Sequence, residues 1–173
     1  VPGSGTYALA TRILAANGMT LSAGVGRGNT DIVAIGGTDA LARLKSGEID
    51  AAIFVGGAQT PTIQEAMREP AVKLMSVERA EAYPRRYRYL TTLRLPPGTI
   101  DLALNIPDRE VVLIGTRAML AAREDFHPAL INLLIEAARE IHGDQGYFEA
   151  AGEFPGIASV DLRVSPHADQ HKR

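Results

Sequence analysis

The sequence contains no cysteine among its 173 residues. This absence excludes disulfides, thiolate metal ligands and a cysteine nucleophile. No apolar run approaches the roughly 18–20 residues of a membrane-spanning helix. The Gly-Lys-Ser/Thr of a P-loop, a strict dinucleotide fingerprint and the Gly-x-Ser-x-Gly nucleophile elbow are also missing. Because no acid/base pair stands out either, we expect a protein that is not an enzyme, with no catalytic residues, cofactor or metal.

The chain also lacks an excess of either charge. It has 18 Lys and Arg residues against 20 Asp and Glu residues, a formal net charge of −2. This balance gives no electrostatic reason to expect nucleic acid or an anionic membrane as partner. The apolar fraction of 46% and the charged fraction of 22% are typical of a globular protein.

Helical and strand-like segments alternate along most of the chain. Helices are predicted over residues 6–17, 38–45, 61–69 and 125–142, the last with a broad buried face, and strands over 32–35, 49–55, 72–77, 91–95, 99–104 and 110–119. The alternation predicts an α/β fold with a mostly parallel sheet flanked by helices. The apolar run 49–55 is typical of a strand buried on both faces.

A glycine-rich turn, Gly3-Ser4-Gly5-Thr6, opens the first predicted helix. The first amides of a helix have no partner inside it, and they lie at the positive end of its dipole. Glycine lets a ligand approach this backbone closely. We therefore expect the amides of Ser4, Gly5 and Thr6, with the two hydroxyls, to bind a carboxylate or phosphate.

A second turn, Gly56-Gly57-Ala58-Gln59-Thr60-Pro61, precedes another predicted helix. Turns after parallel strands lie at the same edge of a sheet, where α/β proteins bind ligands. We expect Gly57, Gln59 and Thr60 to form a second polar edge of the same site. The alternative is that both turns are simple helix caps.

Two further clusters have a functional and a structural interpretation. The run Pro84-Arg85-Arg86-Tyr87-Arg88-Tyr89 would suit RNA or an acidic ligand, but it also fits a solvated helix face with buried rings. His167 and His171 have metal-ligand spacing, but Pro166 and the polar end favour a tail without metal.

Several segments together resemble a known family, the TAXI-type solute-binding proteins of TRAP transporters. They are Pro2-Gly3-Ser4-Gly5-Thr6, Leu44-Lys45-Ser46-Gly47-Glu48-Ile49-Asp50-Ala51, Phe54-Val55-Gly56-Gly57 with Thr60-Pro61, and Ser165-Pro166-His167-Ala168-Asp169. One departure is Ile100, which follows Gly98-Thr99 where the family has a tyrosine.

The resemblance implies a periplasmic-binding-protein-like lobe that is truncated at its N-terminus. Residues 1–108 would be the second lobe, and residues 109–173 the return to the first lobe plus a C-terminal tail. A small organic anion, such as a dicarboxylate or an acidic amino acid, would bind in the cleft between the lobes. The implied partners are membrane permease subunits and, through exposed first-lobe surface, a second copy. Nucleic acid is not among them. The implied location is periplasmic or extracytoplasmic, with a membrane anchor possible after Arg173.

Two other classes stay open on the residues alone. A phosphoribosyltransferase-like enzyme would use the Gly-Ser-Gly-Thr turn for phosphate, although the sequence lacks an acidic diphosphate-binding loop. The effector-binding domain of a transcription regulator would share the two-lobed architecture, and it would need an upstream DNA-binding segment.

Overall fold

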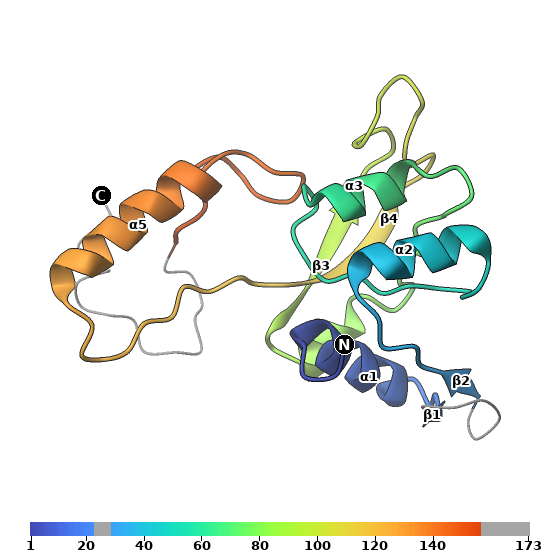
Figure 1. Ribbon diagram of the computed structural model, residues 1–173. Coiled ribbons are helices and arrows are strands. Elements are labelled where there is room, and N and C mark those ends of the chain that lie inside the picture. Colours follow the sequence, from blue (N-terminus) through green and yellow to red (C-terminus); the bar gives the residue numbers. More distant parts are fainter. Residues whose placement is uncertain (23–28, 157–173) are drawn as a thin grey trace. The chain divides into compact units, whose positions relative to one another are not determined.

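A computed structural model describes residues 1–22 and 29–156 of the chain. The fold is mixed α/β, with helices and two small sheets. In chain order its elements are α1 (Gly5–Ala16), β1 (Leu21–Ser22), β2 (Thr30–Asp31), α2 (Gly37–Ser46), α3 (Pro61–Arg68), α4 (Ala82–Arg86), β3 (Leu90–Leu95), β4 (Val111–Thr116) and α5 (Pro128–His142) (Figure 1). The chain divides into two compact units after Leu74. The predicted lobe boundary at Asp108 stays a prediction.

The helices of the first unit begin and end at residues that the sequence identifies. Ser4 is the N-cap of α1, and its hydroxyl accepts a hydrogen bond from the Tyr7 amide at 3.2 Å. Gly18, with φ +77°, follows the end of α1, and Gly47, with φ +75°, ends α2. Left-handed backbone of this kind favours glycine. The predictions of these helices are confirmed to within one residue at each end.

The helix α3 packs against α2 in the first unit (Figure 1). It begins after the N-cap Thr60, with Pro61 at its first position, as predicted. Leu41 of α2 and Ala66 of α3 are the buried apolar side chains among the described residues of this unit. The predicted helix over 61–69 is therefore confirmed and contributes to a small core.

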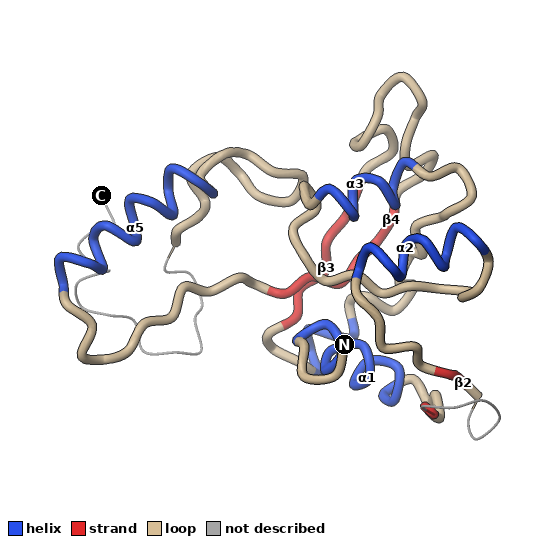
Figure 2. The backbone as a smooth tube through the Cα atoms, viewed as in Figure 1, coloured by secondary structure: helices blue, strands red, loops and turns tan. Residues whose placement is uncertain are grey.

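The predicted strands over 32–35, 49–55 and 72–77 are wrong, because none of these segments is a strand (Figure 2). Among the described residues, the parallel pairing is limited to β1 with β2, two residues each. Ile53 and Val55 stay 49% and 40% exposed. A parallel strand needs a bonded neighbour and cover on both faces, and an apolar run supplies neither by itself. The α/β class is confirmed, but a mostly parallel sheet is not present in the described part of the chain.

The larger sheet is the antiparallel pair of β3 and β4 (Figure 2). Its register runs from Leu90 opposite Thr116 to Leu95 opposite Val111. These two predicted strands are confirmed. The segment 99–104 between them is a turn rather than a strand, closed by the Ile100 amide donating to the Ile106 carbonyl at 2.8 Å.

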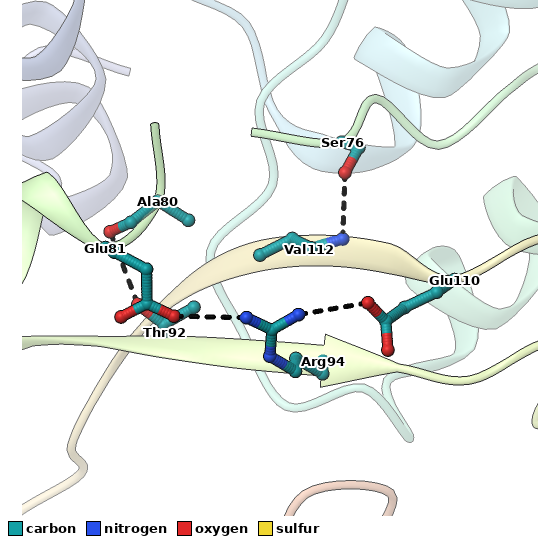
Figure 3. A network of polar contacts seen from close by, with 7 residues as sticks. All are labelled: Ser76, Ala80, Glu81, Thr92, Arg94, Glu110 and Val112. Carbon is teal, nitrogen blue, oxygen red and sulfur yellow. Dashed lines mark hydrogen bonds and ion pairs between the residues drawn. The ribbon is translucent and has the colours of Figure 1, made fainter. Parts of the chain in front are cut away.

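The other edge of β4 is also hydrogen-bonded. The Val77 amide donates to the Val112 carbonyl at 2.8 Å. The Val112 amide donates to the Ser76 hydroxyl at 3.0 Å (Figure 3). On β3, the guanidinium of Arg94 binds Glu81 at 3.2 Å and Glu110 at 3.0 Å. Polar contacts therefore join the segment before α4 to both strands.

The helix α5 begins after His127, whose ring nitrogen Nδ1 accepts from the Ala129 amide at 3.2 Å. Its existence is confirmed, but the expected broad buried face is wrong. Of the residues expected on that face, Ile135 is buried, whereas Leu130 and Ile141 are 46% and 70% exposed. Helical periodicity gives an apolar stripe, but it does not provide the surface that would cover it.

Candidate functional site

The first predicted site lies at the beginning of α1. The Ser4 amide donates to the Val1 carbonyl at 3.1 Å, and the Ser4 hydroxyl donates to the same oxygen at 2.7 Å. Ser4 is therefore engaged in closing its own turn and capping the helix. Within the described residues, the amides of Gly5 and Thr6 make no hydrogen bond. These two amides are the donors that α1 leaves for a ligand.

The approach to these amides is open. No heavy atom lies within 4 Å of the position that a Cβ would take at Gly3 or at Gly5. Gly3 has φ +85°, a conformation that side chains disfavour, so the turn itself requires glycine there. An oxyanion could thus reach the start of the helix without displacing a side chain.

The second predicted group lies at the beginning of α3. The Thr60 amide donates to the Gly57 carbonyl at 3.0 Å and closes the turn that contains Gln59. The Thr60 hydroxyl makes no capping bond to α3. Gly57, Gln59 and Thr60 are all exposed. These three residues are therefore accessible to a ligand, although the Thr60 amide and the Gly57 carbonyl bind one another.

The described residues do not show the two turns meeting. In the first unit α1 contacts β1, while α3 contacts α2. No hydrogen bond or ion pair in the described part of the chain joins Ser4, Gly5 or Thr6 to the turn before α3. A common site formed by both turns stays a prediction.

Sequence reasoning missed a hollow of about 430 Å³ between α2 and α3. Its lining combines hydroxyl, apolar and charged side chains, namely Thr38, Leu41, Ala42, Lys45, Ser46 and Glu65. The Nζ atom of Lys45 lies 2.9 Å from Glu69 and 3.3 Å from Glu65. Nothing in the local sequence pairs these residues, because the contact arises only when the two helices pack.

The ion pair shifts the pKa values of both Lys45 and Glu69. The hydrogen bond to Glu69, followed by the one to Glu65, raises the pKa of Lys45 above its ordinary 10.5. The same bond to Lys45 lowers the pKa of Glu69 below its ordinary 4.5. Each shift favours the charged form, so the pair stabilises the fold wherever both groups are ionised.

The Lys45→Gln variant is expected to lose this stabilisation over a defined pH range. The contribution of Glu69 is present above its ordinary pKa and disappears as the pH falls through the lowered value. That of Lys45 is present below 10.5 and disappears as the pH rises beyond it. Urea unfolding at a series of pH values should show a small deficit between about pH 5 and pH 10 that closes in acid. An equal deficit in Lys73→Gln, whose lysine has no ion pair in the described residues, would contradict the assignment.

Residues 1–22 and 29–156 contain no cluster of three or more His, Asp and Glu side chains arranged to hold a metal ion. His167 and His171 lie outside the described residues, as do the segment 165–169 and the glycine-rich loop 24–28. Among the described helices, none has the length and apolar character needed to cross a bilayer.

Comparisons with protein-family models, with curated proteins and with solved structures each gave no match for this chain.

Proposed function

We propose that the chain is part of a solute-binding subunit of a TAXI-type TRAP transporter and binds a small organic anion. The observation that carries the proposal is the start of α1, where the Gly5 and Thr6 amides are unengaged among the described residues and open to approach. The resemblance of the two glycine turns and of residues 44–51 to that family supports it.

In this proposal one carboxylate of the ligand accepts hydrogen bonds from the Gly5 and Thr6 amides and the Thr6 hydroxyl. The helix dipole favours the negative charge there, by about 0.3–1 kcal/mol at an exposed terminus. Ser4 acts mainly by holding the turn, because its amide and hydroxyl already bind Val1. Gly57, Gln59 and Thr60 supply a second polar edge. No covalent step, cofactor or metal takes part.

The remaining parts of the proposal follow the family. The chain would form one periplasmic-binding-protein-like lobe and the return to the other, and closure of the two lobes on the ligand would signal the permease subunits in the membrane. The protein would act outside the cytoplasm. Titration calorimetry of the full-length product with dicarboxylates, acidic amino acids and sugar phosphates tests this function. If no organic acid binds, the proposal is wrong.

The Gly5→Val variant is expected to weaken binding of the organic acid about tenfold, which corresponds to ~1.4 kcal/mol. The new side chain would stand in open space, so the fold should tolerate it, but it would cover the two donor amides. Calorimetry compares this variant with Ala8→Val, which places the same side chain on an exposed position of α1 one turn later. Unchanged binding in Gly5→Val would exclude the start of α1 as the site.

A further inference from the structure

A cluster of arginine and tyrosine side chains surrounds the end of α4. Arg85 and Arg86 lie in the last turn of this helix, and Arg88 follows two residues after it. All three arginines are exposed, Tyr89 is 40% exposed and Tyr87 is half-buried. We call these five residues the arginine–tyrosine cluster. The cluster includes two of the five tyrosines of the chain.

Local structure fixes how the backbone of the cluster is held. Pro84 falls in the first turn of α4, where a missing amide breaks no helical hydrogen bond. The Tyr87 amide donates to the Tyr83 carbonyl at 2.7 Å, and the Leu90 amide donates to the Tyr87 carbonyl at 2.9 Å. Leu90 is 4% exposed and begins β3. The cluster is thus attached to a strand of the larger sheet.

The arginines of the cluster differ from Arg94, which binds Glu81 and Glu110 (Figure 3). Within the described residues, Arg85, Arg86 and Arg88 form no ion pair. The guanidinium carbon of Arg86 lies 5.9 Å from the centre of the Tyr87 ring. The rings of Tyr87 and Tyr89 are 6.0 Å apart and tilted by 46°. Three exposed arginines without an ion pair in the described residues, one of them beside the Tyr87 ring, are therefore available to a partner.

The surrounding sequence concentrates this charge. Residues 82–93 contain the three arginines of the cluster and no Asp or Glu, whereas the whole chain carries a net charge of −2. Helix C-termini favour cations, which accounts for Arg85 and Arg86 but not for Arg88 beyond the helix. The dipole of this short helix therefore does not account for all three positive charges.

We propose that the arginine–tyrosine cluster binds a short acidic segment of a partner protein. Guanidinium groups form paired hydrogen bonds with carboxylates, and tyrosine rings add apolar contact at little cost in conformational entropy. A long polyphosphate or an anionic bilayer would spread over more of the surface of a chain whose net charge is −2, whereas a short acidic segment requires only the cluster. This inference is independent of the proposed solute site.

Fluorescence anisotropy with a short labelled peptide rich in Glu and Asp tests the proposal. We expect saturable binding that weakens as salt is added, and none to the peptide with Gln and Asn in place of the acids. The combined substitutions Arg85→Gln, Arg86→Gln and Arg88→Gln should raise Kd about tenfold or more, and Tyr89→Ala about threefold. Unfolding curves of each variant establish that the fold is retained.

A charge-matched variant, Lys73→Gln with Arg117→Gln and Arg123→Gln, removes three positive charges elsewhere. It should leave peptide binding within about twofold of the unmodified protein, because exposed charges that make no contact with the peptide are largely screened by salt. Three outcomes would overturn the proposal: no binding of the acidic peptide, equal loss in the charge-matched variant, or tighter binding of a single-stranded oligonucleotide or of anionic phospholipid vesicles than of the peptide.

Discussion

The Leu95→Ala variant is expected to lower the free energy of unfolding by about 2–5 kcal/mol. Leu95 is 1% exposed and lies opposite Val111, itself 2% exposed, at the end of the β3–β4 ladder. Removing its side chain forfeits the apolar transfer energy and leaves a void beside Val111, which the paired backbones cannot close. Urea unfolding followed by circular dichroism measures the loss.

The matched control is Leu102→Ala, which removes the same atoms from a side chain that is 89% exposed. Its effect should stay within about 0.5 kcal/mol, as for most exposed substitutions. If both variants lose the same stability, the ladder between β3 and β4 is not the core of the second unit.

The Gly98→Val variant has the second largest expected effect, a loss of about 1–3 kcal/mol. Gly98 has φ +72°, and its amide donates to the Pro107 carbonyl at 2.9 Å, so the turn cannot easily change its backbone. A Cβ there would also lie 3.3 Å from Cδ2 of Leu102. A branched side chain in this conformation is strained whether or not Leu102 moves. Thermal unfolding measures the shift.

Two further variants distinguish the effect of backbone strain at Gly98 on stability from the effect of replacing any glycine. Gly98→Asn should cost less than Gly98→Val, because asparagine tolerates left-handed backbone. Gly57→Val should have little effect on stability, since Gly57 lacks a positive φ and has open space where its Cβ would stand. Equal losses in Gly57→Val and Gly98→Val would contradict the strain argument.

Local chemistry accounts for the parts of the fold that could be predicted. Ser4 and Gly18 bound α1, and Thr60 with Pro61 begins α3, because capping and left-handed backbone depend on a few adjacent residues. The strand prediction over 49–55 failed for the opposite reason. An apolar run indicates what a segment could bury, whereas a strand exists only where another backbone bonds to it.

The candidate sites show the same difference between features that depend on adjacent residues and features that depend on packing. The hydrogen bond from the Tyr7 amide to the Ser4 hydroxyl follows from cap geometry, and the open Gly5 and Thr6 amides follow from the same turn. The bonds from Ser4 itself to Val1 were not predicted. The contact of Lys45 with Glu69 could not be predicted, because the two residues become neighbours only through the packing of α2 on α3. Sequence patterns therefore predict where a single helix begins or ends more readily than they predict contacts between side chains that are far apart in the chain.

The hydrogen bond from Val112 to Ser76 has a consequence for measuring local opening. Its acceptor is a side-chain hydroxyl outside the β3–β4 ladder. Exchange of the Val112 amide proton with deuterated solvent therefore depends on detachment of the segment at Ser76, whereas the interstrand amides depend on separation of the strands. One backbone proton can thus report the opening of this edge separately from the unfolding of the sheet.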